Sequence, residues 1–308
     1  MKNFINISDH SFNDLRAIID EAKARKLRRK NLNKSASDED KPFEGKSMAM
    51  IFEKPSTRTR MSFDIAVKQL GGSSIILNPD GIHYGKGDET LKDTAKVLTE
   101  YVDIVMLRTS SHKNLEEFGK HLEIPIINGL SDKSHPCQIM SDIMTFEETK
   151  GLITGKVVSW LGDGNNNMSN SLIEAAGKFG FQLKIACPKQ YAPNKNILSW
   201  AKKNKVNLLV TRKPEEAVQD SDCVMTDKWV SMNDKVNKKL KKKILKNYQV
   251  NKKLMQKAKS DAIFMHCLPV GRGEEVTDEV IDGKKSVVWR QALNRVHAQK
   301  SIINWCLD

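Results

Sequence analysis

Short runs of apolar and β-branched residues recur along the chain and alternate with longer segments whose apolar residues have the spacing of one helix face. Apolar residues at consecutive positions are typical of strands that are buried on both faces of a parallel sheet. The longer segments predict amphipathic helices that cover those faces. The pattern predicts strands at 47–52, 74–77, 102–107, 124–127, 156–161, 183–187, 206–210, 222–226, 262–266 and 286–289, and helices that include 63–70, 92–100, 139–149 and 169–179.

This alternation of strands and helices predicts an α/β fold with doubly wound parallel sheets flanked by helices. A chain of 308 residues is longer than the roughly 250 to 300 residues at which a single core stops growing, so we expect two domains. The stretch 150–155, with two glycines, follows a long predicted helix and marks the break between them.

The composition is that of an ordinary globular protein, with 39% hydrophobic and 29% charged residues, and it excludes a disordered chain. No apolar run approaches the roughly 18 to 20 residues that span a bilayer, and the first residues lack the apolar stretch of a signal peptide. We therefore expect a cytoplasmic protein without a membrane partner. Five cysteines without a Cys-x-x-Cys pair fit a reducing compartment and do not indicate a structural zinc site.

The formal net charge is +13, and the segment 235–259 holds eleven lysines and no acidic residue. Its only aromatic residue is Tyr248, whereas single-strand channels interleave aromatic and basic side chains. We interpret the segment as a solvated lysine-rich surface, with weak attraction to polyanions as the alternative, and expect no nucleic-acid partner. A second basic run, 23–30, ends a predicted helix that Ser11 and Asp14 open as a capping box.

Polar clusters follow the predicted strands at their carboxyl ends, where sheets of this kind bind ligands. Helix N–H groups, hydroxyls and forked guanidinium groups together predict a phosphate site. The nucleotide loop G-x-x-x-x-G-K-[ST] is absent, so a nucleoside triphosphatase is not indicated. Directly after strand 47–52, the first turn of a helix contains Ser56, Thr57, Arg58, Thr59 and Arg60.

Two further groups follow strands of the first half. Arg108 comes directly after strand 102–107, and His135 and Gln138 stand at the start of helix 139–149. A histidine and a glutamine at a helix N-terminus can donate to a carbonyl oxygen or an oxyanion. A surface arginine and a hydrogen-bonded loop histidine would explain the same residues, so both interpretations stay open at this point.

In the second half, strand 156–161 is followed by Gly162-Asp163-Gly164 and then by three asparagines. The dinucleotide fingerprint G-x-G-x-x-G needs a glycine where Asn167 stands, so a dinucleotide-dependent oxidoreductase is disfavoured. Three amides suit a small polar ligand better. Asp227 follows strand 222–226, where it can face an ammonium group or cap the loop.

His266 and Cys267 close strand 262–266. Neighbours on a strand point to opposite faces, so a Cys–His nucleophile pair built from these two is disfavoured. We expect Cys267 to meet a substrate directly. Cys187, Cys223 and Cys306 are interpreted as buried, inert thiols.

These residues resemble motifs of the ornithine carbamoyltransferases, in matching order from about Lys46 to Arg295. The S-T-R-T-R and H-P-x-Q motifs are also found in aspartate carbamoyltransferases. The D-x-x-x-S-M and H-C-L-P motifs discriminate, because the aspartate enzymes resemble H-P-L-P where this chain has Cys267. The matching residues here are Ser56-Thr57-Arg58-Thr59-Arg60, His135-Pro136-Cys137-Gln138, Asp227 with Ser231-Met232, and His266-Cys267-Leu268-Pro269.

The resemblance implies transfer of the carbamoyl group of carbamoyl phosphate to the δ-amine of L-ornithine, in a cleft between two domains. Residues 1–150, completed by a C-terminal helix at about 291–308, would bind carbamoyl phosphate, and residues 151–290 would bind ornithine. Catalytic roles are implied for Cys267, Arg58, Arg108 and His135. The implied carbamoyl phosphate ligands are Ser56, Thr57, Arg58, Thr59, His83, Arg108, His135, Gln138, Cys267, Leu268 and Arg295. The implied ornithine ligands are Asn167, Asp227, Ser231 and Met232.

The resemblance also implies a homotrimer in arginine metabolism, with His83 on a loop that a neighbouring subunit lends to the site. It implies neither a cofactor nor a metal ion. Where the family reads S-M-G, this chain has Asn233. A carbamoyltransferase that acts on another amine, such as putrescine or aspartate, is the alternative.

Overall fold

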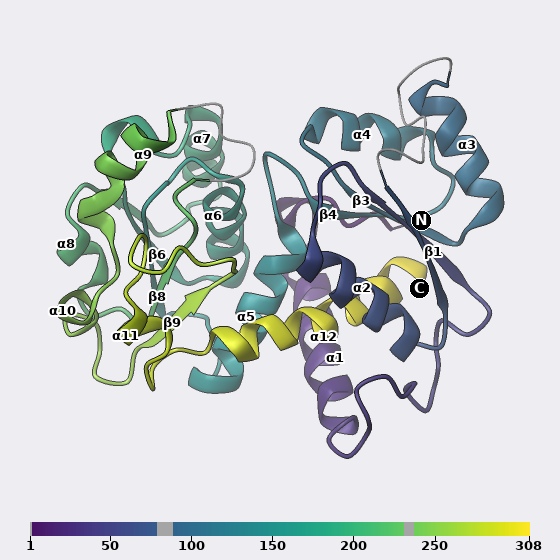
Figure 1. Ribbon diagram of the computed structural model, residues 1–308, viewed down its shortest axis with the longest axis horizontal. Helices are drawn as coiled ribbons and strands as arrows, with labels where there is room; N and C mark the ends of the chain where they lie inside the picture. The colour runs from purple at the N-terminus through teal and green to yellow at the C-terminus, as the bar shows by residue number, and fades with distance from the viewer. Residues whose placement is uncertain (1, 79–88, 231–236) are drawn as a thin grey trace. The chain divides into compact units, whose positions relative to one another are not determined.

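The computed structural model describes residues 2–78, 89–230 and 237–308 (Figure 1). The chain divides into two compact units, of which the first comprises Met1–Met144 with Leu293–Asp308 and the second Thr145–Ala292. Each unit contains one sheet, and every strand pair in the two sheets is parallel. The predicted α/β class with two doubly wound, helix-flanked parallel sheets is confirmed.

The sheet of the first unit has the strand order β2-β1-β3-β4. Its strands are β1 (Ser47–Phe52), β2 (Ser73–Leu77), β3 (Ile104–Arg108) and β4 (Ile126–Leu130). Its helices are α1 (Phe12–Arg28), α2 (Thr57–Gln69), α3 (Leu91–Tyr101), α4 (His112–His121), α5 (Pro136–Lys150), which continues into the second unit, and most of α12 (Val288–Leu307), with a 3₁₀ turn at Ile7–Asp9.

Both faces of β1 are buried from Met48 to Phe52, as its consecutive apolar residues require, whereas the edge strand β2 is partly exposed. Ala49 and Ile51 of β1 pack with Leu98 of α3 and Phe118 of α4 in one apolar cluster. Met50, which points the other way, is buried as well. The Ser11 side chain caps α1 by accepting from Asp14 N–H, and the Asp14 carboxylate accepts from Ser11 N–H. The predicted capping box is therefore confirmed.

The sheet of the second unit has the order β7-β6-β5-β8-β9. Its strands are β5 (Val157–Leu161), β6 (Gln182–Ala186), β7 (Leu208–Thr211), β8 (Cys223–Thr226) and β9 (Ile263–His266). Its helices are α6 (Asn167–Phe179), α7 (Lys195–Lys203), α8 (Pro214–Val218), α9 (Lys238–Leu245), α10 (Lys252–Met255) and α11 (Asp278–Ile281), with 3₁₀ turns at Lys189–Tyr191 and Lys246–Tyr248.

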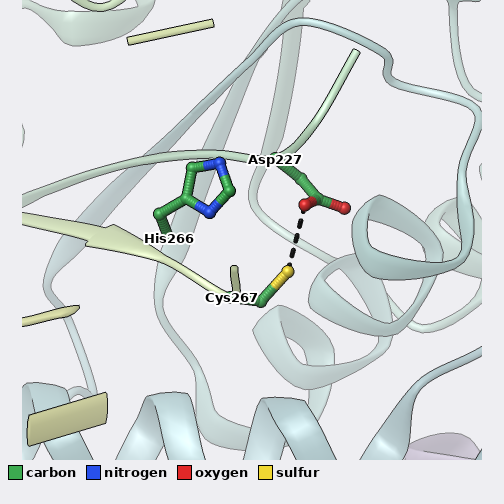
Figure 2. Close-up of side chains that lie close together, drawn as sticks. All are labelled: Asp227, His266 and Cys267. Carbon is green, nitrogen blue, oxygen red and sulfur yellow. Dashed lines mark hydrogen bonds between the residues drawn. The ribbon is translucent and has the colours of Figure 1, made fainter. Parts of the chain in front are cut away.

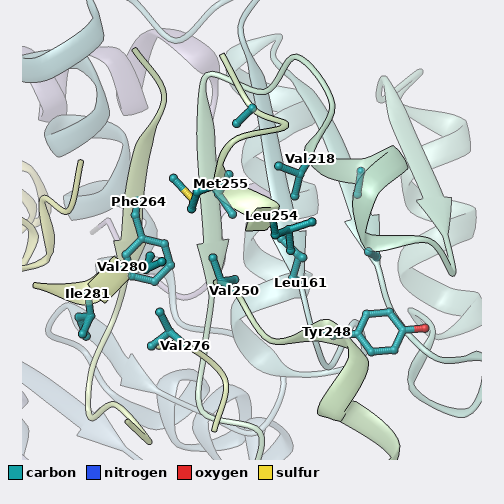
Figure 3. Close-up of a cluster of buried hydrophobic side chains, with 14 of the residues drawn as sticks. Leu161, Val218, Tyr248, Val250, Leu254, Met255, Phe264, Val276, Val280 and Ile281 are labelled. Atoms are coloured by element: carbon teal, nitrogen blue, oxygen red, sulfur yellow. The ribbon is translucent and has the colours of Figure 1, made fainter. Parts of the chain in front are cut away.

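One face of this second sheet contributes Leu161 and Phe264 to a cluster of buried apolar side chains (Figure 3). Val218 of α8, Leu254 of α10 and Ile281 of α11 pack in the same cluster. These short helices therefore cover that face, and the strand ends that carry polar residues are held by a continuous apolar core.

The predicted strand at 286–289 is wrong. Ser286 forms only an isolated bridge to Phe264, and α12 begins two residues later, at Val288. Two valines and a tryptophan after Ser286 do not distinguish a strand from the first turn of a helix. In the ranges that the structure describes, no helix is both long and apolar enough to cross a membrane.

Candidate functional site

The strand orders place a switch point in each sheet, between β1 and β3 in the first and between β5 and β8 in the second. Chain connections leave such a point in opposite directions, and ligands bind beyond the carboxyl ends of the strands there. The predicted polar clusters follow these strands. Phe52 lies opposite Arg108 in the register of β1 and β3, and Leu161 lies opposite Thr226 in that of β5 and β8.

The N-terminus of α2 lies beyond the end of β1. Ser56 is the N-cap residue, its hydroxyl makes no capping bond, and the first turn contains no acidic residue. Helix N–H groups in a first turn without acidic side chains favour an anion. Arg58 is half-buried in this turn.

Thr59 is the meeting point of two guanidinium groups. Its hydroxyl oxygen accepts from Arg108 Nη1 at 3.1 Å and from Arg295 Nη2 at 2.9 Å. Arg295 also donates to Gln138 Oε1, and the Gln138 amide donates to Asp142 Oδ1 at 2.8 Å. Residues from α2, β3, α5 and α12 are thus joined in one buried network, and Thr59 is only 1% exposed.

His135 precedes α5 and is 4% exposed. Burial, together with the positive charges of Arg295, Arg108 and Arg58, holds the pKa of His135 well below the usual imidazole value. The ring is therefore neutral at physiological pH. A neutral imidazole can donate one hydrogen bond to a carbonyl oxygen without carrying a charge into a site that already contains three guanidinium groups.

In the second unit, the two glycines after β5 have different structural reasons. Gly162 has a φ of +121°, a backbone conformation that residues with a Cβ rarely adopt. A Cβ on Gly164 would lie 2.9 Å from the carbonyl oxygen of Tyr191, which is too close. Backbone conformation and packing therefore explain these glycines without a bound pyrophosphate.

The three asparagines after these glycines have different surroundings. Asn166 caps α6 by accepting from Ser169 N–H at 2.8 Å. Asn165 Oδ1 accepts from the amide of Asn194 at 3.1 Å. Asn167 is half-buried and is the first residue of α6.

Asp227 and Cys267 meet beyond the ends of β8 and β9 (Figure 2). The Cys267 thiol donates to Asp227 Oδ1 at 3.1 Å, and the same oxygen accepts from Lys228 N–H at 2.7 Å. Both side chains are half-buried. A carboxylate that already orients a thiol can also receive a cationic or neutral amine.

His266 supports the turn that carries Cys267. Its Nδ1 accepts from Leu268 N–H at 2.8 Å, so the ring proton is on Nε2, which faces Glu275 Oε1 at 3.2 Å. Leu268 has a φ of +59°, and the peptide bond to Pro269 is cis. Left-handed backbone at a non-glycine residue is costly and persists where surrounding bonds enforce it, as the His266 ring does here.

The nitrogen of His266, the sulfur of Cys267 and an oxygen of Asp227 lie within 4.8 Å of one another, and these three are the group of described residues that could hold a metal ion. Such a mixed donor set suits zinc. Both ring nitrogens of His266 are engaged with Leu268 and Glu275, however, so a metal ion would have to displace one of those bonds.

Three residues implied by the resemblance, His83, Ser231 and Met232, lie outside the described residues. The others fall into two groups. In the first unit, Thr59, Arg108, Gln138 and Arg295 are joined by hydrogen bonds, with Ser56, Thr57 and Arg58 on the same helix start and His135 beside the guanidinium groups. In the second unit, Asp227 contacts Cys267, which precedes Leu268, and Asn167 starts α6.

Sequence reasoning missed two buried carboxylates of these networks. Glu275 is fully buried behind His266, and Asp142 is 2% exposed behind Gln138. Asp142 lies four residues after Gln138, one helical turn away, and this spacing could have identified it. Glu275 has no comparable signal, because it lies in a loop with other acidic residues.

Comparisons with known proteins agree with this geometry. Residues 2–148 match the family model of the aspartate/ornithine carbamoyltransferase carbamoyl-P binding domain, and residues 154–306 match that of the Asp/Orn binding domain. The chain is 51% identical over 306 residues to an ornithine carbamoyltransferase of Nitrobacter winogradskyi, covering 99% of this chain and 97% of that protein. It is 50% identical to one of Mesorhizobium japonicum, covering 100% and 99%. The solved ornithine carbamoyltransferase from Pyrococcus furiosus superposes with a TM-score of 0.91 at 42% identity, covering 98% and 96%.

Proposed function

Because the chain belongs to the aspartate/ornithine carbamoyltransferase family, we propose that it transfers the carbamoyl group of carbamoyl phosphate to the δ-amine of L-ornithine, giving L-citrulline and phosphate. The observation that carries the proposal is the contact between Asp227 and Cys267 in the second unit. The Asp227 carboxylate can receive the amino group of an acceptor substrate. The chain reads H-C-L-P at Cys267, whereas the aspartate enzymes resemble H-P-L-P there, so the comparison favours ornithine over aspartate.

We assign carbamoyl phosphate to the first unit, residues 1–150 with the C-terminal helix at about 291–308. The phosphate is bound by the start of α2, where the first-turn N–H groups, three hydroxyls and a guanidinium group come together. The carbonyl end is bound by the network around Thr59. The residues of this assignment are Ser56, Thr57, Arg58, Thr59, Arg108, His135, Gln138 and Arg295, with His83 from a neighbouring subunit. The family resemblance adds Cys267 and Leu268 of the second unit.

Ornithine is assigned to the second unit, residues 151–290. Asp227 receives an amino group, and Asn167 supplies an amide that can bind the amino-acid end of the substrate. The family motif adds Ser231 and Met232. Cys267 lies beside Asp227, so its sulfur would contact the attacking amine.

The reaction is a direct attack of the neutral δ-amine on the carbonyl carbon. A tetrahedral intermediate forms, the carbon–oxygen bond to phosphate breaks with the electron pair leaving on phosphate, and the nitrogen releases one proton. Holding the two reactants in register can supply about 7 to 11 kcal/mol. Donors to the developing oxyanion, for which we propose Arg58, Thr59, Arg108 and the neutral His135, are each worth roughly 2.7 to 4 kcal/mol.

A citrulline assay with purified protein, carbamoyl phosphate and ornithine tests the proposal. Aspartate, putrescine and lysine are run beside ornithine at matched concentrations. We expect carbamoylation of ornithine with the highest kcat/KM. A higher kcat/KM for putrescine or aspartate would replace ornithine as the acceptor, and no product with any amine would refute carbamoyl transfer.

We further propose that the enzyme works as a homotrimer in the cytoplasm, in arginine metabolism, as the family resemblance implies. The five cysteines are free thiols in the structure, which suits a reducing compartment. Light scattering of the purified protein gives the test, since a trimer has three times the mass of a 34.8 kDa chain.

A further inference from the structure

Lys241 differs from the other lysines of the segment 235–259. It is 3% exposed, whereas its neighbours on α9, Lys239 and Lys243, are exposed. Its ammonium nitrogen lies 2.6 Å from Asp163 Oδ2 and 5.1 Å from the ring centroid of Tyr191. The interpretation of the whole segment as a solvated surface is therefore wrong at this residue.

Asp163 organises the loop that leads from β5 to α6. Its second carboxylate oxygen, Oδ1, accepts from Asn165 N–H at 2.8 Å, and its carbonyl oxygen accepts from the Trp160 indole at 2.9 Å. The next residue, Gly164, donates its N–H to the Tyr191 carbonyl oxygen at 2.9 Å. One carboxylate thus connects the loop backbone to α9, four residues before Asn167, which starts α6.

A carboxylate this deeply buried needs a partner. Asp163 is 8% exposed, and removing one member of a buried ion pair leaves an uncompensated charge. Without Lys241, the Asp163 carboxylate loses the charge that compensates it and has to turn toward solvent, which weakens its bond to Asn165. No neighbour on α9 is placed to substitute, since Lys242 pairs with Glu274 and Lys243 is exposed.

We propose that Lys241 is a positioning residue for ornithine, which acts through Asp163 on the loop 162–167 and thereby on Asn167. The inference rests on the proposed function, in which Asn167 binds ornithine. Lys241 does not contact the substrate in this account. It fixes the backbone from which the substrate amide projects.

Lys241→Met tests the proposal, because methionine keeps the apolar length of the side chain and removes its charge. Lys243→Met, on the same helix and exposed, is the matched control. We expect the KM for ornithine to rise about tenfold or more, toward the roughly 100-fold that a misplacement of 1 Å can cost. The KM for carbamoyl phosphate is expected to stay unchanged. Lys241→Arg, which keeps the charge, should recover part of the loss.

A double-mutant cycle with Asp163→Asn asks whether the two residues act as one unit. We expect the double variant to have a KM for ornithine no higher than the worse of the two single variants. Additive effects, or equal rises in the KM values of both substrates, would overturn the proposal. If Lys241→Met does not fold, Asp163→Asn and Lys241→Arg provide the test. The quantity compared is again the rise in the KM for ornithine relative to that for carbamoyl phosphate. Wild-type protein that forms no citrulline would instead refute the proposed function, whatever the variants do.

Discussion

Replacing Arg295 by lysine keeps the positive charge of the side chain but removes the two-pronged geometry of the guanidinium group. The two terminal nitrogens of Arg295 reach Thr59 and Gln138 at once, and a single ammonium nitrogen cannot reproduce this fork. The substitution therefore removes about one charge-assisted hydrogen bond, worth roughly 1.5 to 3 kcal/mol. Arg295 is 4% exposed, so solvent does not replace the lost partner. At about 1.36 kcal/mol per factor of ten, we expect kcat/KM for carbamoyl phosphate to fall roughly 10- to 160-fold.

The assay is initial-rate citrulline formation at saturating ornithine, with thermal unfolding measured on the same samples. Arg290→Lys is the control, because Arg290 lies on the same helix, is exposed and donates to Thr149. His135 should remain neutral in the Arg295 variant, because burial is the largest cause of its lowered pKa. An unchanged kcat/KM for carbamoyl phosphate, or a loss matched by Arg290→Lys, would refute the role of the fork.

Four further outcomes are expected. Arg58→Ala should impair carbamoyl phosphate binding and turnover far more than ornithine binding; equal losses for both would indicate misfolding. Cys267→Ala should lower kcat with the fold intact by circular dichroism, and unchanged kinetics would return the thiol to a structural role. The rate should climb from pH 6 to 9 as the ornithine amine loses its proton. His135 should not contribute to this rise, because burial and Arg295 hold its pKa well below its usual value. A flat profile would contradict attack by the neutral amine. Burial lowers the pKa of His297 to about 3 in the folded protein. Below about pH 6.5 the unfolded chain therefore binds a proton that the folded chain does not, and the free energy of unfolding should fall as the pH drops. The fall should be smaller in His297→Gln.

The sequence alone predicted the features that repeat along the chain. Strand-helix alternation indicated both parallel sheets, and the rule that ligands bind at carboxyl strand ends pointed to the start of α2, to Arg108 and to Asp227. Arg108 is the last residue of its apolar strand and Asp227 directly follows its own, whereas the start of α2 is recognisable by its consecutive hydroxyl and guanidinium side chains. A short segment such as 286–289 is too short to show a periodicity, and its last two residues begin α12.

Residues that act through other residues were not predictable in this way. Lys241 lies 78 positions from Asp163 in the chain, and in sequence it looks like the exposed lysines around it. Glu275 contacts His266 from a loop in which the neighbouring Glu274 pairs with a surface lysine. In both cases burial decides the role of the charge, and burial depends on tertiary packing that a local pattern does not contain.

The two units differ in the charged groups that they offer to a ligand. The proposed reaction needs positive groups for carbamoyl phosphate and a carboxylate for the amine. In the first unit, burial and then three guanidinium groups hold the pKa of His135 well below its usual value, so the ring adds no charge to the positive potential proposed to act on the phosphate and the oxyanion. In the second unit, Lys241 compensates Asp163, while Asp227 Oδ1 accepts only from the neutral groups of Cys267 and Lys228 N–H among the bonds described. In the proposed function Asp227 receives the amine, whereas Asp163 is already compensated by Lys241. The net charge of +13 indicates neither arrangement, because it does not show which charged side chains are buried or paired.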